Sequence, residues 1–264
     1  MKIIKIPFSG GGLGHGNGAN LAPDKIIEQF DELFVNEDGL KPKFEIEALE
    51  LDENNIEESQ KKIYESSKKV NQNNEKAIFL GGDHSVSYGL MKAFFQNNPG
   101  AGVIVFDAHP DLMSSSGTPT QEDYLRMLID EKLIDPKKVI LVGIRNWEGQ
   151  EKEFITLNNM ACFTMKRIFE DGITEVCDSL MELSRNFPSL YLSIDIDAVD
   201  PAFAPGTGYC EPGGLSSREL LYFLQRLKKL KNLKQIDLVE INPKKDQGDM
   251  TSKLGAKILF ELYG

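Results

Sequence analysis

The sequence predicts a three-layer α/β/α sandwich, in which helices cover both faces of a mainly parallel sheet of about eight strands. Two observations lead to this prediction. Short, continuously apolar runs such as VIVF and AIFL recur along the chain, as is typical of parallel strands that are buried on both faces. These runs alternate with amphipathic stretches of helical period, which favours β-α-β-α connectivity. A closed β/α barrel has the same rhythm and stays open as an alternative.

Each strand is expected where an apolar run of strand length is bounded by polar or turn-forming residues. Such runs lie at residues 3–8, 44–51, 77–80, 103–106, 139–142, 161–165, 190–196 and 235–239. Helices are expected where apolar residues recur every three or four positions, at residues 24–35, 56–70, 86–95, 121–133, 173–185, 217–229 and 252–262. No internal repeat, low-complexity tract or Pro/Ser-rich linker divides the chain, so residues 1–264 are predicted to form one domain.

Composition narrows the class of protein. The chain has 264 residues, 41% of them hydrophobic, and its formal net charge of -11 argues against nucleic acid or an anionic membrane as a partner, because both select a basic surface. No apolar run is long enough to span a membrane, and the N-terminal MKIIKIPFSG is interpreted as a first strand instead of a signal peptide. Three cysteines without a C-x-x-C spacing argue against a secreted disulfide framework and favour a reducing cytoplasm.

Three of the predicted strand ends carry unusual polar segments. Ligands of open α/β sheets lie at the carboxyl ends of the strands, so the residues after each apolar run are candidates for chemistry. GGDHS follows AIFL, DAHPD follows VIVF with potential ligands at alternate positions, and DID follows LYLSI. Together these segments supply two of the three histidines in the chain and four acids, namely His84, Asp107, His109, Asp111, Asp195 and Asp197.

The combination of these residues predicts a metal site more strongly than any one segment does. An acid at a strand end often caps the next helix, and a single histidine is often a hydrogen-bonded core residue. Four ionised carboxylates are nevertheless costly to bury, and no lysine or arginine is adjacent in sequence to any of the four acids. An oxygen-rich, sulfur-free set of six ligands favours manganese over structural zinc and suffices for two ions. Two such ions can share a water and lower its pKa, so the set predicts a hydrolase.

The segments GGDHS, DAHPD and SIDIDAVDPAFAPGTG, in this order, resemble the three signature segments of the ureohydrolases: arginase, agmatinase and formimidoylglutamase. The continuation EPGGL resembles agmatinase-like members, although Tyr209 and Cys210 stand where those usually have Thr-Pro. The resemblance implies an arginase-like α/β fold and two Mn²⁺ ions. It implies one ion on His84 and Asp111, the other on His109 and Asp197, and both bridged by Asp107 and Asp195.

The resemblance also implies a reaction and a substrate anchor. A water shared by the two ions would attack the guanidino or formimino carbon, and Asp111 would handle the proton of the leaving amine. Glu240, in the segment VEINP, matches the family's glutamate that pairs with the substrate guanidinium, and a carboxylate can accept the two parallel hydrogen bonds that a guanidinium offers. An ordinary helix cap or surface acid is the alternative reading of Glu240.

Two departures from the family pattern bear on the substrate. The loop after the second motif lacks the usual shuttle histidine; Gln121 lies nearest to its expected position and cannot titrate, which leaves Glu122, water or His15 to carry the proton. Leu112 and Met113, followed by serines, replace the asparagine that holds the amino-acid carboxylate in arginases. The missing shuttle histidine indicates slow turnover or an atypical substrate. The missing asparagine, together with the EPGG ending, favours an agmatinase-like activity on a small guanidino substrate, releasing urea and an amine.

Other functions remain open at this point. Arginase or formimidoylglutamase activity is the nearest alternative, and a metal-binding but catalytically weak member with a regulatory role is a second. A deacetylase-like hydrolase is a third, although such enzymes use fewer aspartates around a single zinc. Homo-oligomers are common in the family, but no sequence feature identifies a contact surface.

Overall fold

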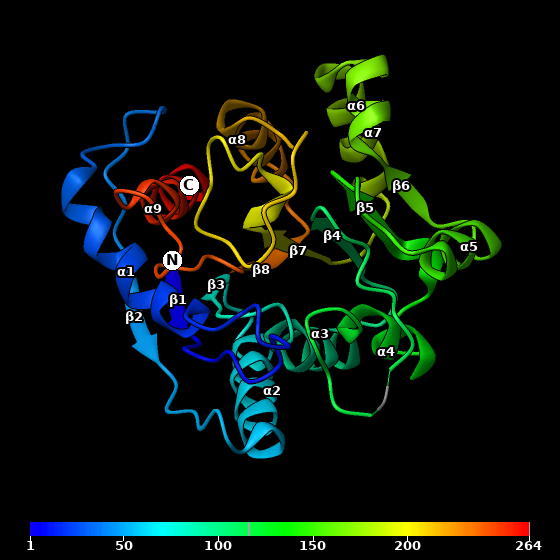
Figure 1. Ribbon diagram of the computed structural model, residues 1–264, viewed down its shortest axis with the longest axis horizontal. Helices are drawn as coiled ribbons and strands as arrows, with labels where there is room; N and C mark the ends of the chain where they lie inside the picture. The colour runs from blue at the N-terminus through cyan, green and yellow to red at the C-terminus, as the bar shows by residue number, and fades with distance from the viewer. Residues whose placement is uncertain (116, 264) are drawn as a thin grey trace.

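A computed structural model describes residues 1–115 and 117–263 of the protein; Ser116, in the loop after the second motif, and Gly264 lie outside the described residues. The described chain contains an eight-stranded parallel sheet with the order β2-β1-β3-β8-β7-β4-β5-β6 (Figure 1). The strands are β1 (Lys2–Lys5), β2 (Glu45–Ala48), β3 (Ala77–Leu80), β4 (Gly102–Phe106), β5 (Val139–Val142), β6 (Ala161–Phe163), β7 (Leu190–Asp195) and β8 (Leu233–Val239). The predicted open sheet is confirmed and the barrel alternative is wrong, because β2 and β6 form two separate edges.

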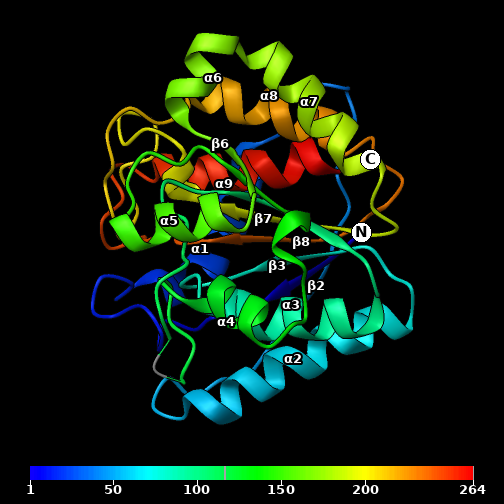
Figure 2. The ribbon, with the colours of Figure 1, turned by 90° about the vertical axis from the view of Figure 1, so that its right-hand side faces the viewer.

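Helices cover both faces of this sheet, as the sandwich prediction requires. The helices of the described residues are α1 (Ala22–Glu28), α2 (Ile56–Gln72), α3 (Val86–Asn97), α4 (Tyr124–Asp130), α5 (Gly149–Leu157), α6 (Met165–Asp171), α7 (Ile173–Arg185), α8 (Ser217–Leu227) and α9 (Met250–Leu262). In Figure 2, α6 to α9 lie above the sheet and α2, α3 and α4 lie below it. Within the described residues, no helix combines the length and the apolar character needed to cross a bilayer.

The two faces of the sheet build two separate apolar cores. Along β4, Ile104 and Phe106 belong to the core beneath α7, α8 and α9, whereas Val103 and Val105 belong to the core beneath α2, α3 and α4. This alternation follows from the two-residue period of a strand, and it explains why the run is continuously apolar.

The central strands end in register, and this places the candidate site. Leu80, Leu238, Ile194 and Phe106 form one row of paired residues across β3, β8, β7 and β4. The polar segments singled out from the sequence begin directly after this row. Because the strands are parallel, these segments meet at one edge of the sheet, as the position of ligands in open α/β folds predicts.

The structure also shows elements that the sequence pattern did not predict. Helices α5 and α6 were not expected, and the predicted helix 24–35 is α1 followed by a 3₁₀ turn at Gln29–Glu32. The predicted strand 161–165 ends at Phe163, because Thr164 caps α6 by accepting a hydrogen bond from the backbone N–H of Arg167. The apolar Met165 therefore starts a helix instead of extending a strand.

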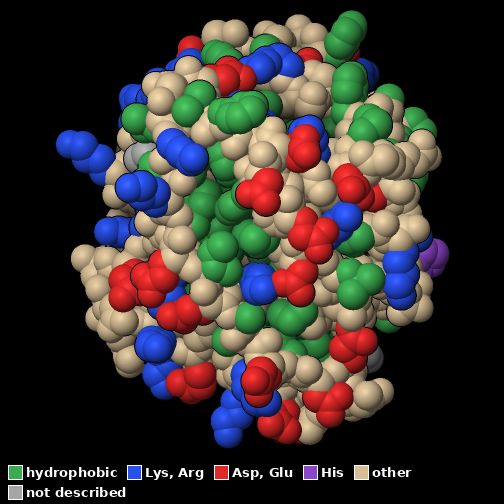
Figure 3. Space-filling view, turned by 90° about the vertical axis from the view of Figure 1, so that its left-hand side faces the viewer, with side chains coloured by type: hydrophobic (Ala, Val, Ile, Leu, Met, Phe, Trp, Pro, Cys, Tyr) green, Lys and Arg blue, Asp and Glu red, His purple; other side chains and the backbone are tan. Residues whose placement is uncertain are grey.

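One side of the molecule shows how its surface charges are arranged. On the face that carries α1 and the edge strand β2, apolar side chains gather near the centre, with acidic and basic side chains around them (Figure 3). Strand β2 is exposed along its whole length. On this face the two signs of charge are interspersed and form no single-sign field.

Candidate metal centre and substrate pocket

The six predicted ligands come together at the carboxyl edge of the central strands. Two groups of potential donor atoms form there, one from His84, Asp107 and Asp111 and the other from Asp107, His109 and Asp197. Within each group the donor atoms lie within 4.8 Å of one another. Asp107 belongs to both groups, and Asp195 adjoins the first, with its Oδ2 atom 3.2 Å from Nδ1 of His84. We call these groups the first triad and the second triad.

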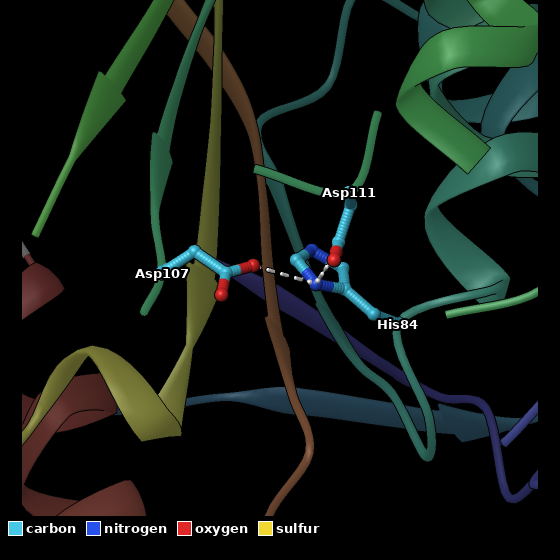
Figure 4. A group of neighbouring side chains, drawn as sticks. All are labelled: His84, Asp107 and Asp111. Atoms are coloured by element: carbon cyan, nitrogen blue, oxygen red, sulfur yellow. Dashed lines mark ion pairs between the residues drawn. The ribbon is translucent and has the colours of Figure 1, made fainter. Parts of the chain in front are cut away.

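In the first triad, His84 points its Nδ1 atom at carboxylates from different segments (Figure 4). This nitrogen lies 3.1 Å from Oδ2 of Asp107 and 3.0 Å from Oδ2 of Asp111. Among the described residues, neither Nδ1 of His84 nor Oδ2 of Asp107 has a partner in hydrogen-bond geometry, although both atoms are fully buried. Orphaned buried polar atoms of this kind call for a ligand.

The other ring nitrogen of His84 explains why Nδ1 is available. Nε2 lies 3.0 Å from Oγ of Ser193, and Ser193 donates its own hydroxyl proton to Asp237 at 2.6 Å. Ser193 can therefore only accept from His84, so the ring proton belongs on Nε2. Nδ1 then presents an unprotonated lone pair to the carboxylate oxygens. A divalent cation can occupy the space between them, and without a cation a second ring proton on Nδ1 can take that position.

The pKa values of the site residues reflect the repulsion between buried carboxylates when no cation is present. Burial, and then the charge of Asp107, raise the pKa of Asp111 well above its usual value. Burial, followed by the charges of Asp197 and Asp107, does the same to the pKa of Asp195. Burial works against a charged His84, yet its contacts with Tyr124 and the carboxylates raise its pKa. Like charges crowded in a buried site repel one another, and a divalent cation removes that repulsion.

The second triad is held by the backbone of the same segments. Nδ1 of His109 lies 3.0 Å from Oδ2 of Asp197, and the other oxygen of Asp197 accepts a hydrogen bond from the N–H of Ala108 at 3.0 Å. Oδ1 of Asp107 accepts from the N–H of His109 at 2.7 Å, and Oδ1 of Asp195 accepts from the N–H of Asp197 at 2.8 Å. One oxygen of each aspartate is thus fixed by the backbone and the other faces the site. Oxygen and imidazole donors at this spacing fit two divalent cations.

Two site residues have backbone conformations that non-glycine residues rarely adopt. Asp111 has φ 54° and Glu240 has φ 63°, both in the left-handed region. Such conformations cost about 1–3 kcal/mol each and cluster at functional sites. Both residues line the pocket above the triads.

Glu240 is buried beside the first triad, so the alternative reading of an exposed surface acid is wrong. Its Oε1 atom accepts a hydrogen bond from the backbone N–H of His84 at 2.7 Å. Burial, and then the neighbouring charge of Asp83, raise the pKa of Glu240 well above its usual value. A buried, uncompensated carboxylate next to a metal site is suited to receive a cationic group of a substrate.

The residues considered for proton transfer lie in different places. Gln121 is buried, and with its amide nitrogen facing acceptors it donates to Gly12 O at 3.3 Å and to Oε1 of Glu240 at 3.2 Å. Glu122 lines the pocket and accepts a hydrogen bond from the Tyr209 hydroxyl at 3.1 Å. His15 is exposed and stacks on the ring of Tyr209, with 4.5 Å between ring centroids, and it is not among the described residues that line the pocket.

A pocket of about 230 Å³ opens above the two triads. Tyr209 covers one wall, where its ring also meets the ring of His109 at 5.4 Å between centroids. The lining residues are His84, His109, Asp111, Met113, Gln121, Glu122, Asn146, Trp147, Glu148, Glu151, Asp195, Asp197, Tyr209 and Glu240. Among the described residues, this lining contains carboxylates and aromatic rings but no lysine or arginine.

Sequence reasoning missed three residues that support the site. Glu151, on the unpredicted helix α5, accepts hydrogen bonds from the backbone of Leu112 at 3.0 Å and of Glu148 at 2.8 Å, and so holds the loop after Asp111. Asp237 lies inside β8 and accepts from Ser193, and Arg145 contacts the loops around Asp197. The available signal for Asp237 was an acidic residue between apolar neighbours inside the predicted strand 235–239.

Comparisons with known proteins agree with this geometry. The Arginase family model matches residues 1–264. An arginase from Staphylococcus aureus is 34% identical over 208 residues, which cover 73% of this chain and 69% of that protein. A formimidoylglutamase from Halalkalibacterium halodurans is 30% identical over 270 residues, covering 98% of this chain and 84% of that one. The crystal structure of formimidoylglutamase from Bacillus subtilis superposes with a TM-score of 0.93 at 27% identity, covering 99% of this chain and 85% of that chain. The chain therefore belongs to the arginase family and is an amidinohydrolase.

Proposed function

We propose that this amidinohydrolase cleaves a small guanidine whose far end is a cationic amine, as in agmatine, and releases urea and an amine. The observation that supports this substrate is the charge of the pocket wall. Beyond the predicted metal ligands, the lining contributes Glu122, Glu148, Glu151 and Glu240 and no basic residue. A substrate with a carboxylate at its far end would bring like charges together there, whereas an ammonium group would be attracted.

The size and the aromatic content of the pocket support the same substrate class. Its volume of about 230 Å³ is below the range of about 300–1,000 Å³ that is usual for drug-sized ligands. Trp147 and Tyr209 contribute aromatic rings to the lining, and aromatic rings attract organic cations. A short, flexible diamine derivative therefore fits the pocket better than a peptide or a large ligand does.

Two Mn²⁺ ions are proposed as the cofactor, held by the first and second triads together with Asp195. His84 and Asp111 would hold one ion, His109 and Asp197 the other, and Asp107 and Asp195 would bridge them. When bound, the ions would supply Lewis-acid polarisation of the substrate and a water of lowered pKa.

The remaining steps belong to side chains of the chain itself. Glu240 would accept two hydrogen bonds from the guanidinium and orient its carbon toward the triads, since the backbone of the described residues donates to its buried carboxylate once, from the N–H of His84. Asp111 would hold the proton that the leaving amine requires, because its carboxyl belongs to the first triad and also lines the pocket. The ring of Tyr209 would limit the access of bulk water to His109.

Glu122 is the proposed route of the proton between the pocket and solvent. Gln121 cannot titrate, and its amide is engaged with Glu240. His15 is separated from the pocket by the Tyr209 ring, whereas Glu122 lines it. We expect Glu122→Gln to lower kcat by about 10²-fold or more, the usual contribution of a positioned acid or base. His15→Ala should leave kcat within a factor of a few, and a larger effect of His15→Ala than of Glu122→Gln would reverse this assignment.

The substrate proposal is tested by product analysis on a panel of agmatine, arginine and formimidoylglutamate with Mn²⁺ present. The expected result is the highest kcat/KM for agmatine, with urea as a product and no turnover by Asp107→Ala. Glu148→Gln should raise KM for agmatine with little change in kcat, because Glu148 lines the pocket but is not one of the predicted metal ligands. Faster release of urea from arginine would contradict the proposed substrate.

Formimidoylglutamase activity is the second candidate, because two of the relatives above carry that name and both match almost the full chain. That substrate carries carboxylates at its far end, so it would need a basic residue in the wall, and the lining residues include none. The two activities differ in their product, since formimidoylglutamate yields formamide and agmatine yields urea. Formamide as the main product across the panel would favour this second candidate.

A further inference from the structure

The side chain of Arg145 is surrounded by backbone carbonyl oxygens from three separate segments. Its Nη2 atom donates to the carbonyls of Asp197 and Glu211, each at 2.6 Å. Its Nε atom donates to Glu211 and Pro212 at 3.2 Å, and Nη1 donates more weakly to Gly143 and Ala198 at 3.3 and 3.4 Å. Within the described residues, Arg145 forms no ion pair with a carboxylate within 4.0 Å.

The backbone at this position is tied to the second motif as well. The N–H groups of Arg145 and Asn146 both donate to the carbonyl of Ala108, at 2.9 and 3.1 Å. Ala108 lies between Asp107 and His109, and its own N–H donates to a side-chain oxygen of Asp197. One residue at the end of β5 therefore contacts both segments that supply the second triad.

The loop after Pro205 is closely fitted to the same guanidinium. A Cβ atom at Gly214 would lie 2.7 Å from Nη2 of Arg145 and 2.6 Å from the backbone nitrogen of Asp200. The side chain of Asn146 donates to Oε1 of Glu211 at 2.7 Å, and that carboxylate lies 3.6 Å from Nε2 of His109. The loop is thus fixed over the second triad through Arg145 and its neighbour.

Arginine suits this position for a physical reason. A planar guanidinium offers five N–H donors in a fixed fork and keeps its charge, so it can satisfy several carbonyls in different directions at once. A lysine ammonium offers three donors from one point and cannot span the carbonyls of Asp197, Glu211 and Pro212 in the same way. In the described chain, the Arg145 side chain forms no hydrogen bond with His84 or Asp111 of the first triad.

We infer that Arg145 is a positioning residue for one cation only: it fixes the Asp197 turn against the second motif and so sets the donor spacing of the second triad. This inference rests on the proposed two-cation centre. Removing a residue that orients metal ligands from behind usually weakens metal affinity about 10- to 100-fold. The loss should fall on the second cation, while the first is retained.

The test is a calorimetric titration of the chelator-stripped full chain with MnCl₂, combined with metal analysis after gel filtration. Wild type should bind two equivalents. Arg145→Gln and Arg145→Lys should each keep one equivalent at wild-type affinity and bind the other about 10- to 100-fold more weakly. Arg126→Gln is the matched control, because Arg126 pairs with Asp130 within α4 and, in the described chain, forms no hydrogen bond or ion pair with a predicted ligand. This variant should bind both equivalents normally.

Two further variants separate a positioning role from a general loss of structure. Gly214→Ala perturbs the loop at Nη2 of Arg145 and should reproduce the selective loss. On an Asp197→Asn background, Arg145→Gln should add no further weakening, since the two residues act on the same site.

Each other outcome has one meaning. If wild type binds no manganese, the proposed metal centre fails. If wild type binds two equivalents and the Arg145 variants also bind both normally, or lose both equally, the inference about Arg145 is overturned while the proposed function stands.

Discussion

The hydrogen-bond chain behind His84 makes a specific prediction about Asp237→Asn. Asp237 is buried and accepts three hydrogen bonds, from Ser193 at 2.6 Å and from Tyr191 and Ser87 at 2.8 Å each. An asparagine has one acceptor oxygen and one donor nitrogen in their place. Keeping that oxygen on Tyr191 and Ser87 turns the amide nitrogen toward Ser193.

This orientation reverses the direction of the chain. Ser193 would then accept from the amide and donate to Nε2 of His84, which forces the ring proton onto Nδ1 and blocks the lone pair that faces the triad. The opposite amide orientation leaves buried hydroxyls without an acceptor, at a cost of about 1–3 kcal/mol. Cation binding at His84 must overcome that cost, so the expected loss is about 5- to 150-fold in affinity for one manganese.

Titration of the metal-free chain with MnCl₂ measures this effect. Ser87→Ala is the matched control, because it removes one donor to Asp237 without changing the direction of the Ser193 contact. It should bind both ions normally and lose only about 1 kcal/mol of stability. Wild-type manganese affinity in Asp237→Asn would refute the tautomer argument.

Three further predictions concern stability. Chelation of the bound metal should lower the Tm by about 5–10 °C in scanning calorimetry. Metal at a hundred times its Kd adds about 2.7 kcal/mol to the free energy of unfolding, and each kcal/mol shifts the Tm by about 2–4 °C. An unchanged Tm would contradict a site in which carboxylates repel one another. Hydrogen bonds from Arg218 and then Gln225 lower the pKa of Glu37 to about 2. The Arg218–Glu37 pair therefore stabilises the fold above pH 4.5 and loses its effect as the pH falls through 2. In Arg218→Gln, NMR titration should show the pKa of Glu37 return toward 4.5, and stability should change by no more than about 1 kcal/mol, because the pair is exposed. Phe106→Ala should cost about 3–5 kcal/mol in urea unfolding, because this fully buried ring packs on Phe223, and a loss below 1 kcal/mol would show that the core relaxes around the gap.

The sequence was most informative where one short segment carried its own signal. The apolar runs predicted the open parallel sheet because burial on both faces requires them, and the acids after those runs stood out because buried charges are costly. Histidines and aspartates at alternate positions of DAHPD predicted a common direction, and the structure does bring those side chains to one edge.

Residues whose role depends on distant partners could not be predicted in this way. The backbone-directed guanidinium of Arg145 and the contact of Gln121 with Glu240 depend on segments that lie far apart in sequence. Tyr209 is an ordinary loop residue until the fold places it between Glu122 and His15. Helix α6 was missed for a local reason, because a helix of this length shows too few turns to establish a period.

The position of β8 in the sheet has a consequence for how the enzyme matures. Every predicted metal ligand lies between His84 and Asp197, yet β8 follows them in the chain and inserts between β3 and β7. Until that late segment takes its place, no strand links β3, which precedes His84, to β7, which ends at Asp195. A nascent chain that has already emerged through Asp197 can therefore assemble the second triad, because β4 and β7 pair directly, whereas the first triad is completed only after β8 has joined β3 to the rest of the sheet.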